Sequence, residues 1–253
     1  ELPAADLTPE QKQANDKREA LFIANRFAAD TWRANFEASP GRAYLKERGF
    51  DESDFEKFGI GYAPESWDYM KEEARKAGHN ENLMVEASLL SRNENGKVYD
   101  RFRDRVMFPI HNLYGKVAGF TGRIIQPDPD KKLSKYMNTT ENTVYQKRDL
   151  LYGLFQAKTA IAREGRCNVV EGNTDVMRWH QRGIENTVGT CGTALTKEHA
   201  RLLHRFTQNV NIVFDGDAAG LKAAIKGIDI LLAEGLNVYV TVMPQGQDPD
   251  SFA

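Results

Sequence analysis

Three short acidic segments, each following an apolar stretch typical of a β-strand, constrain the fold of this 253-residue chain more than any other feature. The acidic segments comprise residues 171–175, 215–217 and 248–250. The strand-like stretches before them span 168–170, 210–214 and 238–243, and the amphipathic helical segments span 174–182, 196–206 and 218–234. Strands that alternate with helices through short connections predict a parallel sheet with helices on both faces.

The acidic segments are predicted to meet, because ligand sites of parallel sheets lie beyond the carboxyl ends of the strands. Converging carboxylates repel one another: at about 4 Å and an effective dielectric constant near 20, each like pair costs on the order of 4 kcal/mol. A bound divalent cation compensates for this repulsion. The carboxylates concerned are Glu171, Asp175, Asp215, Asp217, Asp248 and Asp250.

The ligand type predicts the ion. Oxygen ligands without paired histidine or cysteine suit hard ions, so we expect Mg²⁺ or Mn²⁺, with more than one ion bound, and no zinc in this part of the chain. Mg²⁺ completes its coordination with water and substrate phosphates, which indicates phosphoryl chemistry. For each segment taken alone, a polar turn or a helix cap is the alternative. The order of the three segments, each at a predicted strand exit, favours a shared site.

The N-terminal half has a different pattern. Thr8 and Pro9 predict the start of a long helix that reaches about residue 37. Shorter helices are expected at 41–48, 53–58, 67–76 and 81–88, strands at 98–99, 106–110 and 117–125, and a loop at 126–132. The predicted fold class is α/β, with a mixed α+β N-terminal subdomain at 1–164 and a parallel-sheet subdomain at 165–253.

Basic residues gather in this N-terminal half. Arg101, Arg103 and Arg105 alternate along residues 100–106, and in a strand this period of two places all three on one face. Phosphates lying across that face would offset the like charges, whereas exposed arginines at a sheet edge are the alternative. Arg123 ends the next predicted strand. Further cations alternate with aromatic residues that either stack bases or belong to the core, at Lys135, Tyr136, Tyr145 and Lys147.

The composition indicates the class of protein and its location in the cell. With 41% hydrophobic and 28% charged residues, the chain is typical of soluble globular proteins. Because it has no run of about 18 apolar residues and no signal-peptide pattern, we expect no membrane partner. Cys167 and Cys191 are too few for a disulfide framework and are expected to be buried. These features predict a cytoplasmic protein.

The acidic half resembles the TOPRIM module at residues 171–175 (EGNTD), 192–193 (GT), 215–220 (DGDAAG) and 247–251 (QDPDS). The basic half resembles successive blocks of bacterial DnaG-type primases, among them 44–50 (YLKERGF), 101–110 (RFRDRVMFPI), 119–123 (GFTGR) and 135–138 (KYMN). The similarity runs in order from about residue 44 to the end. Asn173 departs from the pattern, which usually has an aromatic residue there.

The resemblance implies a TOPRIM, Rossmann-like sheet that carries the metal ions. It also implies an enzyme that builds short RNA primers on single-stranded DNA by nucleotidyl transfer from ribonucleoside triphosphates. Glu171 would move a proton, with Asp215 and Asp217 as further catalytic residues. A replicative helicase of the bacterial replisome would bind through a C-terminal region beyond this sequence. The residues implied to line the template and nucleotide groove are Arg48, Arg101, Arg103, Arg123, Lys135 and Lys147.

Two rival functions fit part of the pattern. A topoisomerase or nuclease with the same acidic module would cleave DNA, and a topoisomerase also needs a nucleophilic tyrosine, which the sequence does not identify. A non-catalytic module would bind DNA without using the acids and would form no product. Only a primase requires both ribonucleotides and a template.

Overall fold

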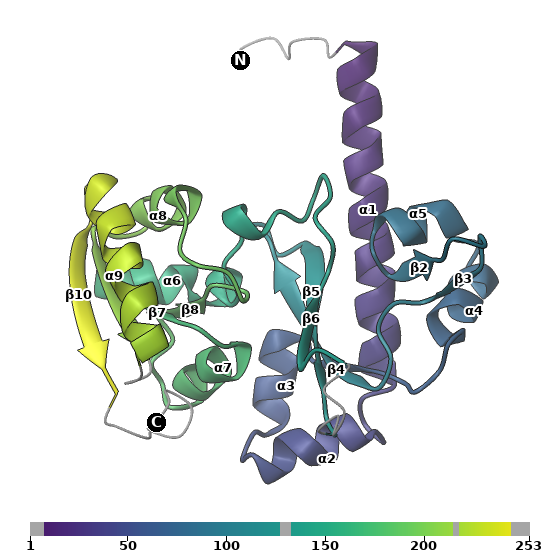
Figure 1. Cartoon of the computed structure of the whole chain (residues 1–253), viewed down its shortest axis with the longest axis horizontal. Coiled ribbons are helices and arrows are strands. Elements are labelled where there is room, and N and C mark those ends of the chain that lie inside the picture. The colour runs from purple at the N-terminus through teal and green to yellow at the C-terminus, as the bar shows by residue number, and fades with distance from the viewer. Residues whose placement is uncertain (1–7, 127–132, 215–217, 244–253) are drawn as a thin grey trace.

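The computed structural model describes residues 8–126, 133–214 and 218–243, which form an antiparallel and a parallel sheet with their helices (Figure 1). The antiparallel sheet and a small hairpin belong to the N-terminal half, and the parallel sheet to the C-terminal half. Most of the predicted loop at 126–132 and the acidic segments at 215–217 and 248–250 lie outside the described residues.

The antiparallel sheet has the strand order β1-β4-β5-β6, and β2 pairs with β3 in the separate hairpin. β4 is buried along almost its whole length, because α1 packs on one face of the sheet and the second half of the molecule on the other. A strand covered on both faces needs a continuous apolar run, which residues 106–110 provide. The strands span β1 Gly61–Ala63, β2 Leu90–Arg92, β3 Val98–Asp100, β4 Arg105–His111, β5 Val117–Ile124 and β6 Tyr136–Asn138.

Helix α1 begins and packs as the sequence predicts. The Thr8 hydroxyl caps the first turn within a capping box, and proline follows at the first helical position. Leu21 and Trp32 are buried against the rest of the N-terminal half, whereas the N-terminal end of the helix extends beyond it (Figure 1). The other predicted helices of this half are also confirmed. The helices span α1 Pro9–Ala34, α2 Pro40–Glu47, α3 Glu52–Phe58, α4 Tyr69–Lys76 and α5 Glu81–Glu86.

A strand through residues 100–106, which would place the three alternating arginines on one face, does not form. β3 ends at Asp100, β4 begins only at Arg105, and a loop lies between them. Asp104 has a φ of +47°, a left-handed conformation that an extended strand does not allow. The loop turns Phe102 into the core, where it packs edge-on against Trp32. No strand face is therefore shared by Arg101, Arg103 and Arg105.

The second half forms an all-parallel sheet of order β10-β9-β7-β8, which confirms the predicted alternation of strands and helices. Helix α7 packs in one apolar cluster with Val170 and Val213, whereas α6, α8 and α9 pack in another with Val169 and Ile212. Neighbouring residues of one strand point to opposite faces, so the helices cover both faces. The sequence did not predict α6 or β8. The elements span α6 Leu154–Glu164, β7 Cys167–Val170, α7 Asn173–Gln181, β8 Thr187–Gly189, α8 Lys197–His204, β9 Asn209–Phe214, α9 Ala218–Ala233 and β10 Asn237–Val242.

One hydrophobic cluster joins the two sheets. Phe58 of α3 stacks on Tyr152 at a ring-centre distance of 5.6 Å and meets His180 of α7 edge-on at 5.2 Å. Gly153 has a φ of +78°, and a Cβ there would lie only 2.7 Å from Val176 of α7. The close approach of α7 to this cluster therefore requires glycine at position 153. The division into subdomains at 164/165 stays a prediction.

Both cysteines are buried and unpaired, as the sequence predicts. Burial raises the pKa of the Cys167 and Cys191 thiols, so both are protonated at neutral pH. Among the helices of the described residues, none combines the length and the apolar character needed to cross a bilayer.

Buried His180 predicts a loss of stability in acid. Burial lowers the pKa of His180 to about 4, whereas an unfolded histidine has a pKa of about 6.5. The unfolded chain therefore binds more protons between these values, so the stability contributed by the neutral ring is complete above about pH 6.5 and is lost as the pH falls toward 4. The amide of a glutamine could still donate to Thr187 O, the present partner of His180 Nε2 at 2.9 Å. We expect His180→Gln to reduce the acid loss of unfolding free energy by on the order of 3 kcal/mol, measured by urea unfolding across this pH range. An unchanged pH profile would contradict this assignment.

Candidate functional site

The first acidic segment forms the turn between β7 and α7. Glu171 is exposed at the carboxyl end of β7, and Asp175 lies in the first turn of α7. The Asp175 carboxylate accepts a hydrogen bond from the Gly172 N–H (2.9 Å) and so caps the helix. A Cβ at position 172 would lie 2.7 Å from that carboxylate oxygen, so a larger residue there would displace the Asp175 side chain. Asp175 therefore acts as a helix cap, and Glu171 stands beside it at the same sheet edge.

The other acidic segments follow β9, which lies next to β7, and β10, which lies next to β9. β9 pairs in parallel with β7, and β10 pairs in parallel with β9, with Val242 opposite Phe214. The three carboxyl ends therefore lie at one edge of the sheet, and Asp215 directly follows β9 in the chain. Within the described residues, no group of three or more His, Cys, Asp or Glu side chains could hold a metal ion. Convergence of the six carboxylates stays a prediction, because the described residues do not include Asp215, Asp217, Asp248 and Asp250.

A cluster of two tyrosines and three cations lies where α2 meets β5 and β6. The guanidinium carbon of Arg123 lies 5.2 Å from the ring centre of Tyr44 and 5.3 Å from that of Tyr136. Arg48 lies 5.8 Å from the Tyr44 ring centre, and its Nη1 donates to Tyr44 Oη at 3.4 Å. Lys135 Nζ lies 5.9 Å from the Tyr136 ring centre. These five residues form the tyrosine–arginine cluster, which unites three of the six predicted groove residues.

Tyr136 connects the tyrosine–arginine cluster to the acidic turn. Its side chain lies close to that of Thr174 in the first turn of α7. Burial, and to a lesser extent the nearby Asp175 carboxylate, raises the pKa of Tyr136. Two residues further along β6, Asn138 Nδ2 donates to Cys191 O (3.3 Å) in the turn that follows β8. The strand next to the cations therefore contacts two connections at the carboxyl edge of the parallel sheet.

The other predicted groove residues lie outside the tyrosine–arginine cluster. Arg101 Nη2 donates to Asn138 O at 3.2 Å, which places Arg101 beside β6. Arg103 instead lies over the exposed ring of Trp67, with 3.9 Å between the guanidinium carbon and the ring centre. Lys147 begins the short helix η1 (Lys147–Asp149), which contacts α8. The structure thus brings Arg101 close to the cluster but holds Arg103 in a separate contact.

Arg105 is structural, whereas its alternation with Arg101 and Arg103 had left a phosphate contact and an exposed sheet edge both open. It is only 2% exposed. Its Nη1 donates to Gly122 O and Ser134 O at 3.1 Å each and to Lys135 O at 3.4 Å, so it fastens the segment before β6 to β5. The sequence allowed two roles for Tyr145, base stacking or packing in the core. The residue is fully buried in the core.

Tyr44 is a site residue that the sequence interpretation missed. A signal was present, because Tyr44 and Arg48 are four residues apart and so share one face of a helix.

Asn173, which departs from the family pattern, is 4% exposed, and its Nδ2 has no hydrogen-bond partner among the described residues.

A family model described as "DNA primase catalytic core, N-terminal domain" matches residues 31–158, and a Toprim-like model matches residues 168–253. The chain belongs to the DnaG-type DNA primase family. A DNA primase from Deinococcus radiodurans is 42% identical over 231 residues, which cover 90% of this chain and 40% of that protein. The family resemblance inferred from the motifs and the α/β fold class are confirmed.

Solved primase structures share the fold. The DnaG primase catalytic domain bound to ssDNA has a TM-score of 0.84 and 34% identity, over 94% of this chain and 77% of that chain. The RNA polymerase domain of Mycobacterium tuberculosis primase DnaG in complex with double-stranded DNA has a TM-score of 0.83 and 37% identity, over 92% of this chain and 75% of that chain. The chain spans about 40% of the length of the curated primases that it matches.

The structural role of Arg105 predicts a stability defect. Arg105→Met should lower the free energy of unfolding by about 2–4 kcal/mol, because it removes the donor to the buried Gly122 carbonyl and to the partly buried Ser134 carbonyl. Arg103→Met removes the same charge from a partly exposed side chain and should cost about 1 kcal/mol or less. Urea unfolding of both variants tests the difference. Equal losses would contradict the structural role of Arg105.

Proposed function

We propose that this chain is the catalytic core of a primase that synthesises short RNA primers on a single-stranded DNA template. The observation that carries the proposal is the approach of β6 to the carboxyl edge of the parallel sheet, where Tyr136 of the tyrosine–arginine cluster lies close to Thr174 and Asp175 and Asn138 donates to Cys191 O. A cationic, aromatic surface beside a carboxylate turn suits a reaction between nucleic acid and a triphosphate at a metal site.

The proposed reaction is template-directed nucleotidyl transfer. The 3′-hydroxyl oxygen of the primer forms a bond to the α-phosphorus of a ribonucleoside triphosphate, and the bond from that phosphorus to the pyrophosphate oxygen breaks. Glu171, exposed at the strand end, accepts the hydroxyl proton. Pyrophosphate leaves, and the primer is one nucleotide longer.

Membership of the Toprim primase family implies dependence on divalent metal. We infer Mg²⁺ or Mn²⁺ in more than one position, and no zinc in this part of the chain. The described residues fit such ions, because Glu171 and Asp175 offer hard oxygen ligands from one turn and Asp215 follows a strand that ends at the same edge. When bound, the ions lower the pKa of the attacking hydroxyl and neutralise the leaving charge. The proposed ligands are Glu171, Asp175, Asp215, Asp217, Asp248 and Asp250.

Template and triphosphate binding is assigned to the cations. Arg101 contacts a backbone carbonyl and Arg123 two tyrosine rings, and neither pairs with a carboxylate among the described residues, so their positive charge stays available to phosphate oxygens. The relatives solved with ssDNA and double-stranded DNA support nucleic acid as the ligand. The proposed contacts are Arg48, Arg101, Arg103, Arg123, Lys135 and Lys147.

The remaining proposals follow the family. They are an RNA primer as product, a replicative helicase as partner, and a cytoplasmic location in the bacterial replisome. The division of labour between residues 1–164 for the template and 165–253 for the metal ions belongs to the same proposal.

Primer synthesis tests the acidic site. Asp215→Ala and Asp217→Ala should each lower the rate of RNA synthesis on single-stranded DNA by about a hundredfold or more, because each removes a proposed metal ligand. Asp229→Ala, which removes an exposed carboxylate of α9, is the matched control. Wild-type rates in both site variants would refute the catalytic assignment. Cleavage of DNA with metal alone would favour a nuclease.

Template binding tests the basic surface. Lys135 is exposed, so Lys135→Ala should leave the fold intact. Loss of one phosphate contact should weaken binding of single-stranded DNA regardless of its sequence and reduce the slope of log affinity against log salt by about 0.7. Fluorescence anisotropy over a salt series measures this slope, and Lys97→Ala in the exposed turn between β2 and β3 is the matched control. A slope equal to that of wild type would remove Lys135 from the groove.

A further inference from the structure

Two side chains of α7 hold the loop that carries Arg48. Residues 48–50 lie in the connection from α2 to α3, and we call them the Arg48 loop. Arg178 donates to Arg48 O and, through Nη1, to Gly49 O at 3.4 Å, and its guanidinium carbon lies 4.3 Å from the ring centre of Phe50. Gln181 Nε2 donates to Gly49 O at 2.9 Å. Every one of these hydrogen bonds goes to a backbone carbonyl of the Arg48 loop, so the bonds do not depend on its side chains.

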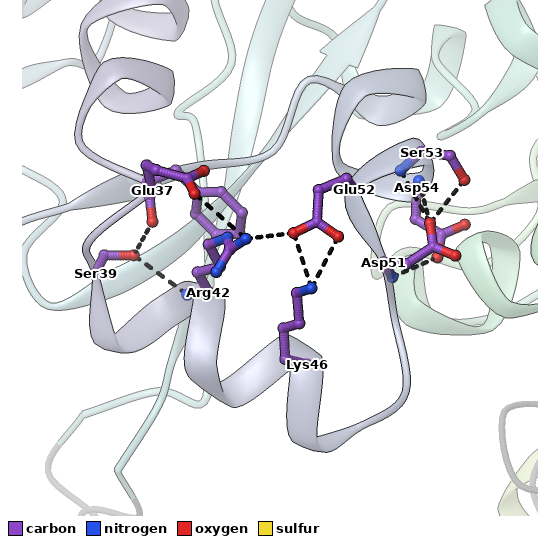
Figure 2. A network of polar contacts seen from close by, with 9 residues as sticks. Glu37, Ser39, Arg42, Lys46, Asp51, Glu52, Ser53 and Asp54 are labelled. Atoms are coloured by element: carbon purple, nitrogen blue, oxygen red, sulfur yellow. Dashed lines mark hydrogen bonds and ion pairs between the residues drawn. The ribbon is translucent and has the colours of Figure 1, made fainter.

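The N-terminal half restrains the same loop from the other side. The Gly49 N–H donates to Lys46 O at 2.8 Å, and Gly49 has a φ of +82°, the left-handed conformation that ends a helix. Arg42 and Lys46 of α2 both pair with Glu52 at the start of α3, as Figure 2 shows. The backbone on both sides of Arg48 is therefore fixed, and the Arg48 side chain lies against Tyr44 in the tyrosine–arginine cluster.

Gln181 also reaches the cap of α3. Its Nε2 donates to the Asp54 carboxylate at 2.7 Å, and that carboxylate accepts the Asp51 N–H at 3.0 Å in the capping box drawn in Figure 2. Asp54 is only 3% exposed, so the amide of Gln181 supplies a hydrogen bond that water cannot easily replace. Gln181 thus ties the Arg48 loop and the first turn of α3 to one helix.

Helix α7 begins at the acidic turn and ends at these contacts. It has nine residues, about 13 Å of helix, with Asp175 in the first turn and Gln181 at the end. A short, largely buried helix behaves as one rigid body. Its two ends therefore set the distance between the acidic turn and the Arg48 loop.

We propose that Arg178 and Gln181 are positioning residues that hold Arg48 at a set distance from the acidic turn, so that a template phosphate bound by Arg48 is aligned with the reacting end of the primer. This inference rests on the proposed primase function. The two residues act on the template through Arg48 and have no phosphate contact of their own. Loss of either leaves Arg48 in the molecule but no longer held in place for binding.

A double-mutant cycle on template affinity tests the inference. Arg48→Ala leaves the backbone carbonyl that Arg178 contacts, so the α7 contacts survive in that variant. Arg178→Ala and Gln181→Ala should each weaken binding of a labelled single-stranded oligonucleotide about three- to tenfold, close to the effect of Arg48→Ala, because all three variants lose the same phosphate contact. In the Arg48→Ala background, neither substitution should weaken binding further.

The readouts separate positioning from stability and from direct contact. Binding is measured by anisotropy in EDTA over a salt series, and thermal unfolding is measured on every variant. The destabilisation by Arg178→Ala should be the same in the wild-type and Arg48→Ala backgrounds, whereas its effect on affinity should vanish in the Arg48→Ala background. Gln181→Ala changes no charge, yet the salt slope should fall by about 0.7, as for Arg48→Ala. Arg182→Ala, which removes an exposed cation at the end of the same helix, is the matched control and should retain wild-type affinity.

Two results would overturn the inference. If Arg178→Ala weakens binding equally with and without the Arg48 side chain, Arg178 binds phosphate directly. If Gln181→Ala lowers the melting temperature but leaves affinity and salt slope unchanged, the α7 contacts are structural only. Arg48→Ala with wild-type affinity would instead refute the groove assignment in the proposed function, which distinguishes the two failures.

Discussion

The docking of α7 between the two sheets is the constraint on which the rest of the structure depends. Val176 lies so close to Gly153 that no side chain fits there, and Phe58 contacts His180 while stacking on Tyr152. These contacts belong to the cluster that joins both halves of the molecule. Because α7 starts at the acidic turn, its burial determines where the carboxylates lie relative to the basic strands.

The cations of the candidate site are held in a way that preserves their charge. Arg123 lies between the rings of Tyr44 and Tyr136, and Arg101 donates to a backbone carbonyl. Neither forms an ion pair with a carboxylate among the described residues. Aromatic faces and carbonyl oxygens stabilise a guanidinium without neutralising it, so a phosphate can still bind. A chain with a formal net charge of −2 can in this way keep a cationic surface beside an acidic edge.

Short sequence patterns predicted helices and strands more reliably than they predicted what individual side chains do. The Thr8 cap predicted α1, and the alternation of strands and helices predicted the parallel sheet, because caps and hydrophobic periods act over one element. The alternation of arginines at residues 101–105 suggested that they share one strand face. The positive φ of Asp104 prevents such a strand, and Arg105 lies in the interior. β8 has only three residues, too few for a period to show, and it forms because α7 returns the chain beside β7.

The sequence by itself determined the chemical groups available to this protein, which are carboxylates after strands of a parallel sheet and cations with aromatic neighbours, and the family to which the chain belongs. Only the tertiary structure decided which cations share a site, since Arg48 and Arg123 meet at Tyr44 although 75 positions separate them in the chain. It also decided that Arg178 and Gln181 reach the Arg48 loop. Contacts between distant segments depend on how elements pack, and packing is a property of the whole core that no local pattern encodes.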